Sequence, residues 1–392
     1  MKKFLEQVAE EILLNYGNHD THLKIILPNK RSEIFLKNYL KEKATETYWI
    51  PDLYTTDEFI IKQSGLNLAD PILVYFKLYN IHKKLEDKKA MPIEDFLSWA
   101  PIMLSDFNDI DLYLVNAKHV FTHLTETKAL EQWNLSGQPL TELQSNYIFF
   151  YQSLFAYYTE LRSNLLGKKL GYKGMIYRQL SENKKTLTRP LKGSKFIIVG
   201  LNALSETEKD IFGYLKDHFE NAFYWDADEY YIFPNKTAYD QIEAGRFING
   251  LIKKWNLTDI KWINNNLVNT KKTFHIHGIP KQMGQVKYIG QQLNNWREDH
   301  LLNPEDIDTA IVLADENLLL PLLNSLPQIE IENEGEIPYN LTTGYPLKNT
   351  ILCRFILQWI NFLIKAEDFQ FQKYDTWQLI SLLKAPMLSY VL

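Results

Sequence analysis

Asp226 and Asp228, with Glu229 beside them, directly follow the apolar segment 222–225. Carboxylates at the end of a strand can hold Mg²⁺ for nucleotide hydrolysis. The same residue types also suit a polar turn that ends a strand. We favour the turn, because the loop that would bind phosphates beside such a metal is absent. Asp226 and Asp228 are therefore only weak candidates for metal ligands.

A phosphate-binding loop needs two glycines, then Lys and Ser or Thr, so that backbone amides and one lysine surround the phosphates. The Gly167-Lys168 pair is followed by Lys169, and no glycine lies five positions earlier. No Gly-x-Ser-x-Gly elbow occurs, and the single cysteine, Cys353, lies in an apolar segment. The sequence therefore predicts no cofactor in this chain and no acyl-transfer chemistry.

Two further groups of charged residues are expected to be solvated. Asp106, Asp109 and Asp111 are spaced like one exposed face of a helix. The segment 181–195 is basic and contains proline and glycine, which predicts an exposed linker. Its lysines and arginine could also bind the phosphate groups of a nucleic acid.

The pattern of apolar residues predicts a helix-rich α/β fold. Short apolar runs followed by helical patterns are typical of parallel strands covered by helices. Such runs occur at 23–27, 48–50, 196–200, 222–225, 273–279 and 309–313. Between the second and third runs, apolar residues recur at three- and four-residue steps, which predicts a large helical insertion at 66–191. The segment 263–272 is expected to be a linker.

Composition limits the classes of protein that are possible. The net charge is −5 and the aromatic content 14%, which argues against a protein that coats DNA through general basic charge. One cysteine suits a reducing compartment, so we expect a cytoplasmic protein. The N-terminal segment has the pattern of an amphipathic helix rather than a signal peptide. No apolar run approaches the roughly 18 residues of a membrane span, so no membrane partner is expected.

Six segments resemble one family in their order along the chain. They are Ile25–Arg31, Tyr48–Ile60, Phe96–Asp111, Ile198–Ser205, Trp225–Tyr231 and Gly344–Thr350. Together they resemble the N-terminal helicase-like region of AddB-like helicase–nucleases, a bacterial group of PD-(D/E)XK nuclease family proteins. The chain departs from the family's active relatives at two points. Residues 1–17 stand where the phosphate loop should be, and Ile198-Val199 stand where a Mg²⁺-binding carboxylate should be.

The resemblance implies RecA-like (P-loop NTPase-like) parallel-sheet domains. The first would combine residues 1–65 and 192–262, split by the insertion at 66–191. The second would span 272–392 and is expected to be incomplete, with a nuclease domain beyond it. This chain would then be an inactivated helicase, not catalytic by itself, while the full-length protein would be a PD-(D/E)XK exonuclease.

The function implied is that of a DNA-binding scaffold in double-strand-break repair and recombination. It would hold single-stranded or forked DNA and could assemble with a helicase subunit. Asn29, Lys30 and Arg31 are candidate DNA contacts, because they follow a strand at the edge where parallel sheets bind ligands. Thr343 and Lys348 are weaker candidates. Two alternatives stay open: a protein-interaction scaffold without DNA binding, and a Mg²⁺-dependent ATPase or nuclease using Asp226 and Asp228.

Overall fold

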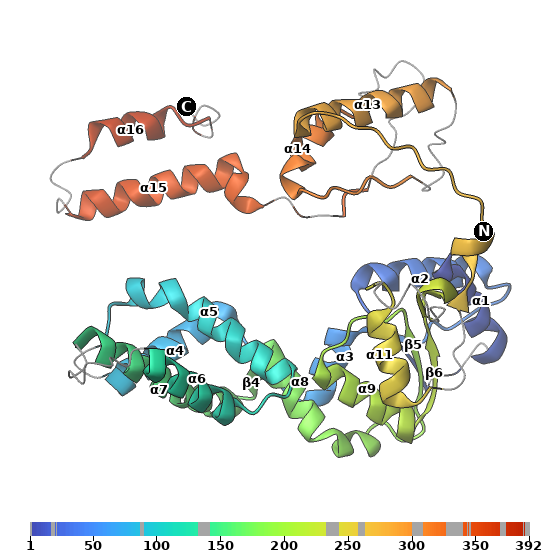
Figure 1. Ribbon diagram of the computed structural model, residues 1–392, viewed down its shortest axis with the longest axis horizontal. Coiled ribbons are helices and arrows are strands. Elements are labelled where there is room, and N and C mark those ends of the chain that lie inside the picture. Colours follow the sequence, from blue (N-terminus) through green and yellow to red (C-terminus); the bar gives the residue numbers. More distant parts are fainter. Residues whose placement is uncertain are drawn as a thin grey trace. The chain divides into compact units, whose positions relative to one another are not determined.

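The chain divides into two compact units, Met1–Lys272 and Thr273–Leu392, drawn in Figure 1 from a computed structural model. The structure describes residues 2–16, 20, 22–86, 90–131, 142–232, 243–257, 263–299, 309–326, 340–342, 344, 346–368, 374–386 and 388. The fold is helix-rich α/β. No helix within these ranges is both long and apolar enough to cross a lipid bilayer.

A four-stranded parallel sheet forms the centre of the first unit. Its strands are β1 (Leu23–Leu27), β2 (Asp52–Thr55), β5 (Lys195–Val199) and β6 (Glu220–Tyr224), in the order β2-β1-β5-β6. The strands expected at 23–27, 196–200 and 222–225 are confirmed to within two residues at either end. All pairings in the sheet are parallel, as the alternation of apolar runs and helices predicted.

The strand expected at 48–50 was wrong, because the chain joins the sheet only after Pro51. Proline has no N–H to donate to a ladder. Asp52 is the first residue in register, opposite Lys24, and the Lys24 ammonium lies 2.8 Å from the Asp52 carboxylate. Trp49, which an inner strand would have buried, is 69% exposed.

Helices cover both faces of the sheet. Ile25 and Leu27 pack with α1 (Phe4–Tyr16) and α2 (Lys30–Lys43) on one face. Ile26 points to the other face, as the two-residue repeat of a strand requires. There it packs in a core shared by α3 (Thr56–Ser64), α8 (Lys173–Glu182), α9 (Glu206–His218) and α11 (Arg246–Trp255).

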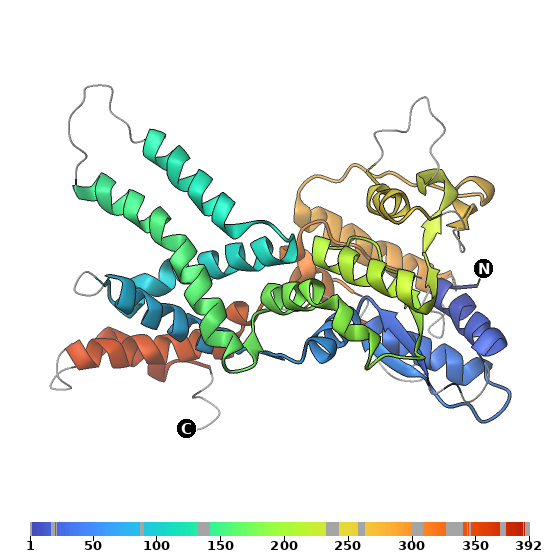
Figure 2. The same ribbon diagram turned by 90° about the horizontal axis from the view of Figure 1, so that it is seen from below.

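The helical insertion has a hydrophobic core of its own. Its helices are α4 (Pro71–Glu86), α5 (Ile93–Leu112), α6 (Ala117–Glu131) and α7 (Glu142–Leu166). Figure 2 shows α6 and α7 running side by side in opposite directions. At the base of the insertion, the short strands β3 (Asn67–Leu68) and β4 (Leu170–Gly171) pair in parallel. The sequence did not indicate this pair, because two residues are too few to show a periodic pattern.

Helix α8 belongs to both cores of the first unit. Met175 is buried in the core of the insertion, whereas Ile176, Tyr177 and Leu180 are buried in the core beside the sheet. The insertion is therefore joined to the sheet through a shared helix.

Two segments expected as linkers are structured instead. The segment 181–195 contains the 3₁₀ helix η2 (Lys184–Thr188), and Leu187 and Leu191 are buried against the sheet core. The segment 263–272 begins with β8 (Ile263–Asn264), which pairs with β7 (Ala227–Asp228), and continues into α12 (Asn266–Asn269). The short helix α10 (Glu229–Ile232) follows β7.

The regular elements of the second unit are all helices within the residues that the structure describes. Its elements are α13 (Gln282–Glu298), η3 (Glu316–Leu318), α14 (Leu319–Leu323), η4 (Leu347–Asn349), α15 (Ile351–Asp368) and α16 (Thr376–Leu383). The helix expected after residue 281 is confirmed. The strands expected at 273–279 and 309–313 were wrong: neither segment has a ladder partner among the described residues, and a strand needs one for its backbone groups. Ile276 is accordingly 94% exposed.

Close contact between α5 and α8 depends on Gly174. A Cβ atom at this position would lie 2.3 Å from the Asn108 carbonyl oxygen, and the Gly174 N–H donates to Asn108 Oδ1 at 2.7 Å. We expect Gly174→Ala to lower the free energy of unfolding by about 1–3 kcal/mol, because the two backbones must separate. Urea denaturation measures this change.

The matched control is Gly250→Ala in α11, where an added Cβ meets no atom within 4 Å. This change should stabilise the protein by about 0.5–1 kcal/mol, since alanine favours a helix over glycine. Equal urea midpoints for wild type and Gly174→Ala would mean that α5 and α8 do not approach in this way.

Candidate nucleic-acid interface

The carboxyl ends of the four parallel strands define one edge of the sheet. From β1 the chain moves outward to β2, and it later returns through the insertion to β5 on the other side of β1. The edge between β1 and β5 is thus the switch point at which open parallel sheets usually bind ligands. Asn29 and Lys30 follow β1 there, and Gly200 follows β5 in a left-handed conformation with φ of 65°.

Asn29 has a structural role at this edge. It is the N-cap of α2, and its Oδ1 accepts hydrogen bonds from the Ser32 N–H at 2.9 Å and from the Ser32 hydroxyl at 3.0 Å. An N-cap of this kind satisfies donors that the first turn of a helix leaves free. The side chain of Asn29 is therefore committed to the start of α2.

Lys30 is held by two carboxylates. Its ammonium lies 2.7 Å from Glu33 and 2.7 Å from Glu58. Hydrogen bonds to Glu33 and then to Glu58 raise the pKa of Lys30. Glu58 also accepts from the Thr55 N–H, while Thr55 Oγ1 accepts from the Glu58 N–H, forming a capping box at the start of α3. The Lys30–Glu58 pair thus joins the beginnings of α2 and α3.

Of the three candidates that follow β1, Arg31 is the one whose charge is left for a ligand. It is exposed and forms no hydrogen bond or ion pair with any residue that the structure describes. Sequence reasoning grouped it with Asn29 and Lys30, but tertiary contacts separate their roles. Glu58, which neutralises Lys30, was missed because it lies 28 residues away along the chain.

The two weaker candidates belong to the second unit. Lys348 is exposed on η4. Thr343 lies outside the described residues.

Asp226 and Asp228 lie beside a hollow of about 330 Å³ that Asn202, Tyr231 and Asn264 also line. Asp228 Oδ1 accepts from the Tyr230 N–H at 3.0 Å, and its Oδ2 accepts from the Leu267 N–H at 2.9 Å. Asp228 therefore links α12 to the turn that follows β6. Asp226 has no such partner within the described ranges, and partial burial raises the pKa of its carboxyl. No group of three or more His, Cys, Asp or Glu that could hold a metal occurs among the described residues.

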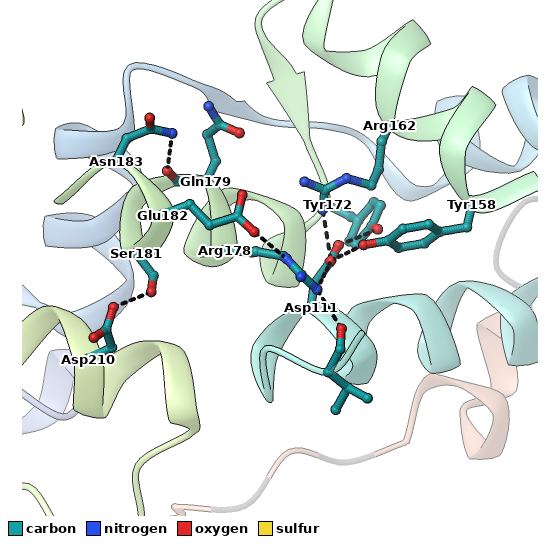
Figure 3. A network of polar contacts seen from close by, with 11 residues as sticks. Asp111, Tyr158, Arg162, Tyr172, Arg178, Gln179, Ser181, Glu182, Asn183 and Asp210 are labelled. Atoms are coloured by element: carbon teal, nitrogen blue, oxygen red, sulfur yellow. Dashed lines mark hydrogen bonds and ion pairs between the residues drawn. The ribbon is translucent and has the colours of Figure 1, made fainter. Parts of the chain in front are cut away.

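Asp111 is the centre of a buried polar network (Figure 3). Its side chain is fully buried, so the expectation of a solvated Asp111 was wrong, whereas Asp106 and Asp109 are exposed. Asp111 follows Phe107 by four residues, which puts it on the buried stripe of α5. That spacing was the signal available in the sequence.

Two arginines and two tyrosines surround the Asp111 carboxylate. Arg162 lies 2.8 Å and Arg178 lies 3.4 Å from its Oδ1, and the hydroxyls of Tyr158 and Tyr172 donate to it. Burial, followed by the adjacent carboxylate, raises the pKa of both tyrosines, so both hydroxyls stay protonated donors. Buried charges are tolerated when they are paired and hydrogen-bonded in this way.

The network reaches the candidate interface through α8. Arg178 of α8 binds Asp111, and the preceding residue, Tyr177, donates its hydroxyl to Asp57 in the first turn of α3. Lys173 lies 2.9 Å from the same Asp57 carboxylate. Asp57 adjoins Glu58, the partner of Lys30, so the insertion and the sheet edge are fixed to one another.

A search of protein-family models found no match to this chain. A search of curated proteins also found no match.

Removing the charge of Asp111 should be strongly destabilising. In Asp111→Asn two guanidinium groups remain near the core without their shared counter-ion, and breaking a buried pair in this way costs about 3–5 kcal/mol. Chemical denaturation measures the loss. Asp109→Asn is the control on the exposed side of α5 and should change stability by less than about 0.5 kcal/mol. Similar small effects of both changes would contradict the network.

His82 is a buried histidine in the insertion. It is 2% exposed, its Nδ1 lies 2.7 Å from the Tyr157 hydroxyl, and its Nε2 accepts from the Met91 N–H at 3.0 Å. Nε2 therefore carries no proton, and burial lowers the pKa of His82. The folded protein holds the neutral ring, whereas the unfolded chain takes up a proton near the ordinary pKa of about 6.5.

We expect the contribution of His82 to the free energy of unfolding to be fully present above this unfolded-state pKa. It should decrease as the pH falls from there toward the lowered pKa of the folded state. The slope contributed by His82 is at most about 1.4 kcal/mol per pH unit. Urea titrations at several pH values between 8 and 5 should show a shallower slope for His82→Gln than for wild type. Identical slopes would show that His82 does not titrate differently in the folded state.

Proposed function

We propose that this chain is a non-motor, helicase-like DNA-binding scaffold that serves a helicase–nuclease in double-strand-break repair and recombination. The observation that carries the proposal is the switch-point edge of the parallel sheet, where Arg31 offers a charge free of partners among the described residues. Single-stranded or forked DNA is the ligand, and a helicase subunit is the expected partner. The two units would correspond to RecA-like domains.

The environment of Lys30 supports a scaffold rather than a motor. A lysine that binds nucleotide phosphates must present an uncompensated charge within a loop of free amides. Lys30 instead pairs with Glu33 and Glu58, whose carboxylates would repel a triphosphate. The end of β5 offers buried Ile198 and Val199 at the neighbouring position, which cannot bind a cation.

A protein-interaction scaffold is the second candidate, and one observation favours it. Helix α15 exposes large apolar side chains over most of its length, among them Ile356, Trp359 and Leu363. Exposed apolar surface of this kind is typical of protein-binding sites. Stable capture of a helicase subunit by a chain that binds no nucleic acid would support this function instead.

Removing the charge of Arg31 should weaken DNA binding. We expect Arg31→Gln to lower the affinity for labelled single-stranded and forked DNA, and to reduce the salt dependence by about 0.7 log units per log unit of salt for the single strand. Fluorescence anisotropy across a salt series without nucleotide measures both. Lys41→Gln, at the far end of α2, removes an equivalent charge as the control. Absence of binding by wild type at low salt would refute the DNA-binding function.

A further inference from the structure

Two lysines, Lys77 and Lys168, lie near each other at the base of the helical insertion, and a third, Lys169, follows Lys168 in the chain. Strand β3 leads into α4, and α7 leads into β4, so the pairing of Asn67 with Leu170 places the start of α4 beside the end of α7. The Asn67 N–H donates to the Lys169 carbonyl at 2.9 Å. Helices α4 and α7 pack against each other, with Lys84 paired with Glu160. Two turns nearer the base, Lys77 of α4 lies near Lys168, which follows α7.

No acidic side chain neutralises this cluster within the part of the chain that the structure describes. Neither Lys77, Lys168 nor Lys169 has a carboxylate at ion-pair distance among those residues. Glu160 of α7, further from the base, is paired with Lys84 at 2.8 Å. Partial burial, together with the charge of Lys168, lowers the pKa of Lys77. The end of α7 carries partial negative charge that favours a cation, but it does not account for several ammonium groups in one place.

The backbone at Lys169 gives an independent sign of function. Lys169 has φ of 54°, a left-handed conformation, in the turn three residues after the last residue of α7, Leu166. Glycine or asparagine usually occupies such a position, because a longer side chain is strained there. Strain retained at an exposed residue suggests that its side chain is needed.

An exposed aromatic side chain is the sequence neighbour of Lys77. Phe76 is 52% exposed and precedes Lys77 on α4, and Leu73 lies one turn earlier with 41% exposed. Proteins that bind single strands combine cations for the backbone with aromatic rings on which bases stack. A membrane-binding helix would be apolar along a whole face, whereas the exposed apolar residues of α4 are confined to its first two turns.

We infer that Lys77, Lys168 and Lys169 bind the phosphodiester backbone of single-stranded DNA, with Phe76 stacking on a base. This site deepens the proposed DNA-binding function and rests on it. It extends the proposed contact with the DNA from the edge of the sheet to the helical insertion. An oxyanion between Lys77 and Lys168 would supply the counter-charge that the described residues do not.

The test is fluorescence anisotropy of the whole chain with a labelled oligothymidine across a salt series. The double variant Lys77→Gln/Lys168→Gln should bind at least several-fold more weakly, with a salt slope reduced by about 1.4, twice the ~0.7 of one contact. The control Lys41→Gln/Lys253→Gln removes two exposed charges elsewhere in the first unit and should leave the slope nearly unchanged. Circular dichroism verifies that each variant is folded.

Lys169→Gly separates a binding role from a structural one. Glycine accepts the left-handed conformation without strain, so this variant should melt at a higher temperature than wild type while binding the oligothymidine more weakly. Higher stability with unchanged affinity would overturn the role of Lys169.

The remaining outcomes distinguish this site from the proposed function. If wild type binds and the Lys77→Gln/Lys168→Gln variant binds equally well, the site is refuted while the DNA-binding scaffold stands. If wild type binds no oligothymidine, the proposed function and this site both fail. Lysine-dependent sedimentation with phosphatidylglycerol vesicles in that case would assign the cluster to a lipid surface.

Discussion

Asp111 lies on the buried face of α5, with its carboxylate between the guanidinium groups of Arg162 and Arg178 and the hydroxyls of two tyrosines. These partners come from α7, α8 and the segment between them, so one carboxylate holds together elements far apart in the sequence. A buried charge is stable only while its partners stay in place. The position of α8 on the insertion is therefore constrained by electrostatics as well as by packing.

Helix α8 transmits this constraint to the sheet. The same helix buries Ile176 and Leu180 beside the sheet and donates from Tyr177 to Asp57 at the start of α3. Glu58, next to Asp57, both caps α3 and binds Lys30. The charges at the carboxyl edge of the sheet are thus linked to the insertion through α3 and α8.

Electrostatics also limits where an acidic chain can meet DNA. With a net charge of −5, general attraction to phosphate is weak. Several lysines near the sheet are neutralised locally, as Lys37 is by Glu33 and Lys43 by Glu6. Cations without such partners among the described residues are consequently the places where binding of an anion gains most. Arg31 and the lysines at the base of the insertion are of this kind, and both belong to the first unit.

The sequence by itself determined the elements whose signals are local. The apolar runs of β1 and β5 depend on neighbouring residues, and each strand forms where its pattern indicates. The large helical segment between two halves of one sheet was equally visible, because helical periodicity persists over many residues.

Only the tertiary structure decided which of the predicted strands form and which charged side chains are buried or paired. The segment 273–279 has the pattern of a strand but no partner among the described residues. The strand expected at 48–50 does not form, because the chain joins the sheet only after Pro51. Asp111 is buried and Lys30 is neutralised by residues distant in sequence. The physical reason is that periodicity and capping arise within a few residues, whereas ladders, ion pairs and burial require contacts that exist only after the chain has folded.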